Sequence, residues 1–160
     1  MFTNLLRGAA AGAAATTVLN AVTYLDMAWR ARPASDLPQQ AVDELARRAG
    51  KPVPGEGEQR QHRLEGLGPL AGIGTGIGIG MAAGLLRPIV TRLPLLFGAT
   101  LLGGAAMAAS DVPMAKLGLA DPSKWSGQQW ATDVAPHLAY GLTAAAVLRS
   151  WPRRKDLVTD

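Results

Sequence analysis

Asp133 and His137 are the two side chains of this 160-residue chain whose types and spacing are best suited to chemistry. Residues four apart on a helix share a face, so the carboxylate of Asp133 can hold one imidazole nitrogen of His137 and set its protonation. Pro136, beside them, removes a backbone donor and permits a kink. Such a pair is suited to binding a proton or a cation, or a metal ion if two histidines and carboxylates converge.

Other polar side chains lie inside or at the borders of the apolar stretches. Each is costly in hydrocarbon, so we expect the set to face the interior of a helix bundle, toward one face of a membrane. The functional interpretation is a proton or cation site. The alternative, which we favour, is an interhelical hydrogen-bond clamp with the carboxylates near the span ends facing water. The candidate polar residues are Asn20, Tyr24, Asp26, His62, Glu65, Asp111, Asp133, His137 and Tyr140.

The sequence carries no pattern typical of an enzyme. The absence of cysteine excludes a disulfide, a thiolate nucleophile, an iron–sulfur cluster and a cysteine-based zinc site. No serine nucleophile with a base is recognisable, so a catalytic role is disfavoured and we predict no cofactor. The net charge of +4 is spread too evenly to form a nucleic-acid-binding stripe.

Four blocks of bilayer length must position these side chains. Each is uncharged or carries a single aspartate, and about 20 residues of helix span the roughly 30 Å of hydrocarbon. Pro94 opens the third block and the sequence "SDVP" closes it, while Ser126 is placed to cap the fourth. We therefore predict an all-α, polytopic four-transmembrane-helix bundle as one membrane domain over residues 1–160. The predicted spans are 8–28, 67–86, 93–110 and 128–148.

Two less favoured interpretations of these blocks stay open at this point. Ala-rich helices are only weakly hydrophobic, so a buried helical hairpin in a soluble bundle would look similar. The first 28 residues also share features with a cleaved signal peptide, although the region "NAVTYLDMAW" is too polar and bulky for a cleavage site.

The hydrophilic loop over residues 30–65 is predicted to contain a short amphipathic helix over 36–49. Apolar residues at helical spacing follow a capping Ser35 or Asp36, and Gly50 ends the pattern. We favour a connector helix over a partner-binding one because its apolar stripe is narrow. From Glu56 onward, only glycine interrupts the sequence, so one long helix can continue into the second span.

The basic residues predict the orientation in a membrane. Four spans place both termini and the link 87–92 on one side, where the flanking segments are short and basic. This density favours cytoplasmic termini, although the opposite orientation stays open. The basic residues of that side are Arg7, Arg87, Arg92, Arg149, Arg153, Arg154 and Lys155.

Glycines recur every four residues along the second span. Such a row forms a slowly drifting stripe that lets a neighbouring backbone approach closely, as in a glycine zipper. A phosphate-binding loop is disfavoured because neither a strand nor a Gly-Lys-Ser/Thr ending is present, and an isolated strand cannot satisfy its backbone in lipid. We slightly favour packing on the first span over packing on another copy. The predicted helix-packing residues are Gly8, Gly12, Gly68, Gly72, Gly76, Gly80 and Gly84.

At "NAVTYLD" and "APHLAYG", and in the Ala/Gly-rich spans around them, the chain resembles small multi-pass inner-membrane proteins of unknown function from high-GC actinobacteria. The resemblance implies a bacterial inner (cell) membrane and no established activity or cofactor. Two function classes follow from the whole sequence. The first is a structural or accessory protein that contacts the lipid bilayer and packs as a homo-oligomer or in a larger membrane complex. The second is a small channel, transporter or cation- or proton-binding protein that uses Asp133 and His137.

Overall fold

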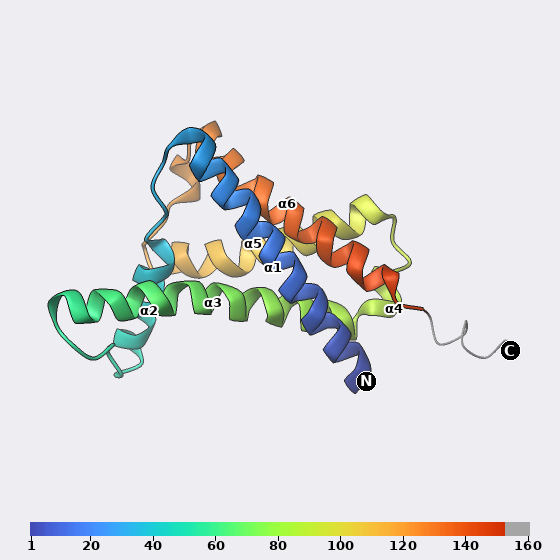
Figure 1. Cartoon of the computed structure of the whole chain (residues 1–160), viewed down its shortest axis with the longest axis horizontal. Helices are drawn as coiled ribbons and strands as arrows, with labels where there is room; N and C mark the ends of the chain where they lie inside the picture. The colour runs from blue at the N-terminus through green and yellow to red at the C-terminus, as the bar shows by residue number, and fades with distance from the viewer. Residues whose placement is uncertain (153–160) are drawn as a thin grey trace, which may run out of the picture.

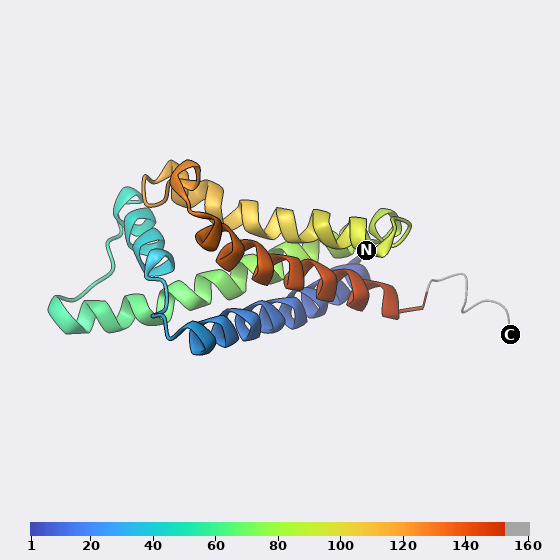
Figure 2. The same cartoon turned by 90° about the horizontal axis from the view of Figure 1, so that it is seen from above.

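The computed structural model describes residues 1–152, and this part of the chain contains helices and no strand. Four long helices, α1 (Phe2–Arg30), α3 (Gly57–Leu85), α5 (Leu95–Lys116) and α6 (Gly127–Ser150), run lengthwise through the molecule in alternating directions (Figures 1 and 2). One end of the bundle, which we call the arginine end, contains Met1, the short helix α4 (Arg87–Val90) and the last turn of α6. The opposite end, which we call the loop end, contains α2 (Leu37–Arg48) and the α5–α6 connection. The predicted all-α class is confirmed. Arg153, Arg154 and Lys155 lie outside the described residues.

Three of the long helices, α1, α3 and α5, are long and apolar enough to cross a membrane. α6 is not among them, although its 24 residues exceed the 22 of α5. The polar residues Gln128, Gln129, Asp133 and His137 in its first half account for its lower hydropathy.

The ends of α3 and α6 follow local sequence signals. α3 begins at Gly57 and continues without a break through Pro69 into the apolar stretch, as expected from the lack of strong breakers after Glu56. At α6, the Ser126 hydroxyl accepts a hydrogen bond from the Gln129 N–H at 3.2 Å, and the Gln129 side chain accepts one from the Ser126 N–H at 2.8 Å. This capping box satisfies two backbone donors and confirms Ser126 as the cap.

The sequence "SDVP" does not end α5, which corrects the predicted boundary at residue 110. The helix continues through Pro113 to Lys116 and ends where Gly118 adopts a left-handed conformation with φ of 77°. The Gly118 N–H bonds to the Ala115 carbonyl at 3.0 Å, and the Leu119 N–H bonds to that of Met114 at 2.9 Å. These two bonds stabilise the end of the helix, whereas the proline removes only one donor. Asp111 therefore lies within the helix.

α2 lies on the first half of α3, at the loop end (Figure 1). A Cβ atom built on Gly68 would lie 2.9 Å from the backbone nitrogen of Gln39, so the absence of a side chain at Gly68 permits the contact. The Arg60 guanidinium of α3 also forms an ion pair with Asp43 of α2. No residue of α2 is buried, so α2 is a surface helix attached to α3.

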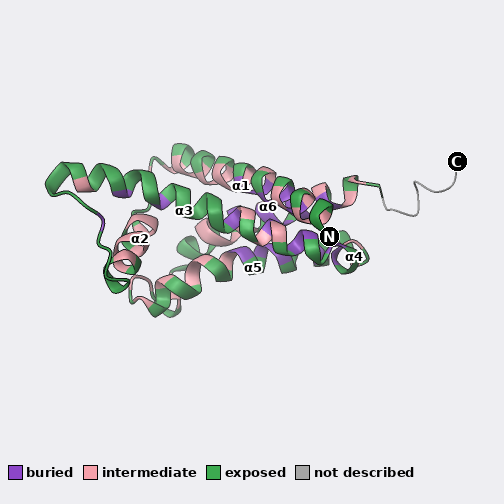
Figure 3. Ribbon diagram, turned by 90° about the horizontal axis from the view of Figure 1, so that it is seen from below, coloured by how far each residue is buried: buried purple, intermediate pink, exposed green. Residues whose placement is uncertain are grey.

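The core is formed by backbones that approach each other at glycines, and buried residues gather where the four long helices meet (Figure 3). A Cβ atom built on Gly12 of α1 would lie 2.6 Å from the Gly76 carbonyl oxygen of α3, and one built on Gly80 would lie 2.6 Å from the Gly12 nitrogen. The α5–α6 contact has the same character. A Cβ atom on Gly103 would lie 2.6 Å from the His137 carbonyl oxygen, and one on Gly141 would lie 2.5 Å from the Gly103 nitrogen. Neither contact leaves space for a side chain.

The glycine row of α3 is divided between two partners and open solvent. Gly76, Gly80 and Gly84 face Gly8, Gly12 and their neighbours on α1, whereas Gly68 faces α2. Gly72 is exposed and has no atom within 4 Å of a Cβ position, so it makes no helix contact within residues 1–152. Successive members of an i, i+4 row are rotated by about 40° around the helix, so one straight partner cannot cover the whole row.

We predict that replacing Gly80 with Leu destabilises the bundle, because its side chain must displace the α1 backbone. Overpacking of this kind costs roughly 1–3 kcal/mol. Thermal unfolding in detergent measures the effect. Gly72→Leu is the matched control, because it makes the same change on the same helix where no atom of residues 1–152 lies within 4 Å of a Cβ position. Equal melting temperatures for the two variants would contradict a tight α1–α3 contact.

Candidate functional site

A polar cluster between α5 and α6 contains the predicted Asp133–His137 pair. His137 Nδ1 lies 2.8 Å from the Asp133 carbonyl oxygen and 3.3 Å from Asp133 Oδ1. Its Nε2 lies 3.5 Å from the Ser110 hydroxyl of α5, and that hydroxyl donates to Asp111 Oδ1 at 3.2 Å. We call Ser110, Asp111, Asp133 and His137 the α5–α6 cluster. Ser110 was not predicted, since a lone serine at the end of an apolar run gives no distinctive signal.

Two carboxyl groups face each other in this cluster. The carboxyl groups of Asp111 and Asp133 are close enough to repel each other when both are charged, and His137 Nδ1 lies 3.3 Å from Asp133 Oδ1. Asp133 Oδ2 is buried and has no hydrogen-bond partner among the described residues. Two adjacent negative charges repel each other, so this geometry favours the uptake of a proton or a monovalent cation.

The predicted metal-site alternative requires both histidines to converge, and they do not. His62 is exposed on the outside of α3, beside a shallow pocket that includes Arg63, Leu67 and Leu70. Glu65 is also exposed, and its carboxylate accepts a hydrogen bond from Gln61 at 3.3 Å. Within residues 1–152, no three histidine, aspartate or glutamate side chains are close enough together to hold a metal ion.

Asp26 belongs to a second cluster, which links α1 to α6. Its Oδ2 accepts hydrogen bonds from Arg30 Nη2 at 2.5 Å and from Arg32 Nε at 2.6 Å. Arg30 Nη2 also donates to the Thr132 hydroxyl of α6 at 2.6 Å. The left-handed Ala31, with φ of 48°, turns the chain so that Arg32 returns to Asp26. Asp26 is therefore paired with arginines instead of joining the α5–α6 cluster.

Tyr140, one of the predicted polar residues, makes a buried hydrogen bond between two helices. Its side chain is 1% exposed, and its hydroxyl donates a hydrogen bond to the Gly76 carbonyl of α3 at 2.6 Å. Because Gly76 also faces Thr16, this bond lies where α1, α3 and α6 meet. Asn20 is half-buried and Tyr24 is exposed, and neither side chain has a hydrogen-bond partner within residues 1–152.

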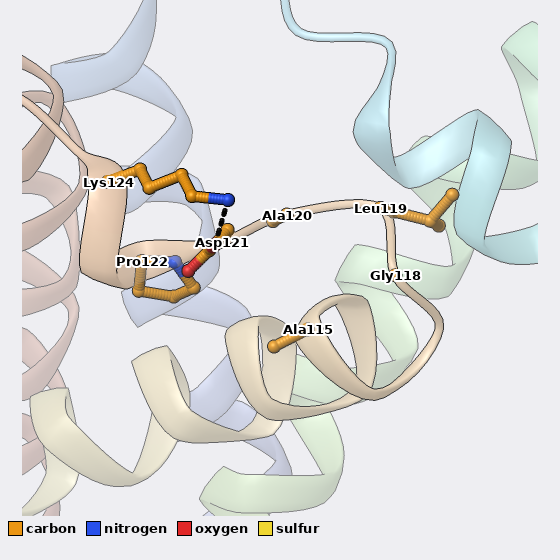
Figure 4. Close-up of a pocket in the computed structure, with 7 residues that line it drawn as sticks. All are labelled: Ala115, Gly118, Leu119, Ala120, Asp121, Pro122 and Lys124. Carbon is orange, nitrogen blue, oxygen red and sulfur yellow. Dashed lines mark ion pairs between the residues drawn. The ribbon is translucent and has the colours of Figure 1, made fainter.

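A separate pocket of about 510 Å³ lies in the α5–α6 connection (Figure 4). The Lys124 ammonium forms an ion pair with the Asp121 carboxylate at 2.9 Å there. Hydrogen bonds from Ser123 and Lys124 lower the pKa of Asp121 below its ordinary value. The pocket contains no residue of the α5–α6 cluster. Its lining consists of Ala115, Gly118, Leu119, Ala120, Asp121, Pro122 and Lys124.

Comparison with protein-family models, curated proteins and solved structures gave no match. A function for this chain is therefore argued from its own geometry.

We predict that Tyr140→Phe lowers the free energy of unfolding by about 0.6–1 kcal/mol, because it removes one buried interhelical hydrogen bond. Unfolding in detergent measures this difference. Tyr24→Phe is the control, since it removes the same hydroxyl from a side chain that is 60% exposed. A Tyr140 variant as stable as the control would show that the bond adds nothing to the bundle.

Proposed function

We propose that this protein is an integral membrane protein in which α1, α3, α5 and α6 all cross the bilayer. The apolar α1, α3 and α5 support this proposal, and α6 packs with them while its Asp133 and His137 side chains are only 22% and 14% exposed. All four tryptophans support it as well. Trp29, Trp125 and Trp130 lie at the loop end and Trp151 at the arginine end, where aromatic residues anchor membrane helices.

The proposed location is a bacterial inner membrane, with the arginine end and both termini in the cytoplasm. The orientation is supported by the short basic flanks at that end. The bacterial origin is supported by the resemblance of the sequence to actinobacterial membrane proteins.

The proposed role is that of a structural or accessory subunit, which packs as a homo-oligomer or in a larger membrane complex. One observation supports this role most directly: a second row of small residues on α3 has no partner in the described part of the chain. Gly74 and Gly78 have no atom within 4 Å of a Cβ position, and Ala82 continues the row on the exposed face. While the inner glycines of α3 act as a glycine zipper toward α1, this outer row is open to the backbone of another membrane helix.

We predict that the protein purified in native lipid has a mass above the 16.6 kDa of one chain. Gly78→Leu should reduce that mass to one chain, because leucine fills the outer row. Native mass measurement gives both the subunits and any bound lipid or metal. A wild-type protein that runs as a single chain, or a Gly78 variant that assembles normally, would refute the proposed role.

A second candidate function is a small channel, transporter or proton- or cation-binding protein. The specific observation in its favour is the α5–α6 cluster, where two carboxyl groups lie beside an imidazole and Asp133 Oδ2 has no hydrogen-bond partner within residues 1–152. Polar groups inside a bundle often mark an ion or proton pathway.

We predict for this second candidate that His137→Ala reduces proton or Na⁺ flux into proteoliposomes at least tenfold between pH 5 and 8, where an imidazole titrates. His62→Ala is the matched control, because it removes the only other histidine from an exposed site. No flux with the wild-type protein, or equal flux with both variants, would eliminate this candidate and leave the accessory role.

A further inference from the structure

Acidic and basic residues are separated along the bundle. Ten of the 12 acidic residues of the chain fall within residues 1–152, and all ten lie toward the loop end. The arginine end carries the N-terminal amine, Arg7, Arg87, Arg92 and Arg149, and no acidic residue within the described part of the chain. Arg7, Arg92 and Arg149 therefore give this end an excess of positive charge within residues 1–152.

The described contacts of Arg149 and Arg7 are with uncharged groups, so they do not neutralise the two positive charges. Arg149 donates hydrogen bonds to the carbonyls of Leu93 at 2.7 Å and Ala145 at 3.0 Å, and these oxygens carry no net charge. The Arg7 guanidinium lies 5.9 Å from the ring centre of Trp151, in a cation–π contact. Both side chains are thus oriented by the fold while their positive charges remain uncompensated by a described carboxylate.

Apolar side chains surround these charges at the same level. Leu86 and Ile89, at the short helix α4, are 55% and 59% exposed, and Arg92 is exposed two residues after α4 ends. Trp151 is partly buried beside Arg7. Exposed apolar residues next to arginines and a tryptophan are typical of the depth at which lipid headgroups meet acyl chains.

We propose that the arginine end binds an anionic phospholipid, with Arg7, Arg92 and Arg149 around the headgroup phosphate. Guanidinium groups bind phosphate oxygens through charge-assisted hydrogen bonds, and basic sites between membrane helices on the cytoplasmic side recognise anionic headgroups. Leu86 and Ile89 contact the acyl chains, which a free phosphate ion lacks. The inference rests on the proposed membrane location.

The experiment measures binding of phosphatidylglycerol, phosphatidylcholine and inorganic phosphate to the purified full-length protein in neutral detergent. Phosphatidylglycerol should bind and raise the melting temperature, whereas the other two should not. The double variant Arg7→Gln/Arg92→Gln should bind phosphatidylglycerol roughly thirtyfold more weakly, because each basic residue near the surface contributes about fivefold. Arg87 and Arg149 stay unchanged because they hold the end of α6.

Arg63→Gln is the matched control, since it removes an exposed arginine from the loop end. Its affinity should equal that of the wild-type protein. Equal binding of phosphatidylcholine, equal protection by inorganic phosphate, or an equal loss in the Arg63 variant would each overturn the lipid site. Reporter fusions at residue 160 and within residues 50–57 test the membrane proposal separately, because only a failure of the four-span topology places both reporters on one side.

Discussion

The close approach of α1 and α3 at their glycines is the contact on which the rest of the bundle depends. With no side chains between them, the two backbones lie so near that Gly12 and Gly80 exclude even a methyl group. This proximity brings the Gly76 carbonyl within reach of Tyr140, which in turn fixes α6 against α3. The second glycine contact, at Gly103 and Gly141, then sets α5 against α6 and so determines which polar groups meet at the loop end.

Hydrogen bonds at the two ends of the bundle have different partners. At the loop end, side chains bond mostly to other side chains, as in the pairing of Asp26 with Arg30 and Arg32. At the arginine end, guanidinium groups donate to backbone carbonyls, and Arg87 does so at Leu148 with a distance of 2.9 Å. Pairing with carboxylates neutralises charge, whereas pairing with carbonyls only orients it, so within residues 1–152 the fold holds Arg149 without neutralising it.

Much of the architecture was predictable because it depends on local rules. Uncharged runs predicted the long helices, Ser126 predicted a helix start, and the spacing of Asp133 and His137 placed them on one face. Contacts between helices were harder to predict from the sequence, since they depend on where each helix ends and on how it is rotated about its axis. Asp111 lies near Asp133 because α5 continues through Pro113. Asp26 forms an ion pair with Arg32 because the left-handed conformation of Ala31 turns the chain back. A glycine row likewise predicts a close helix contact. Because the row rotates around the helix axis, however, it does not predict which helix each glycine contacts.

The lengths of the four long helices have a consequence for the surrounding lipid. α1 and α3 have 29 residues each, whereas α5 and α6 have 22 and 24. At 1.5 Å per residue, the two pairs differ by roughly 7–10 Å. The first nine residues of α3, 57–65, are mostly polar, so in the proposed membrane this part of the helix extends beyond the hydrocarbon instead of stretching it. Lipid beside α3 therefore keeps its ordinary thickness, and the loop end presents a projecting helix, with α2 packed on it, to the aqueous phase.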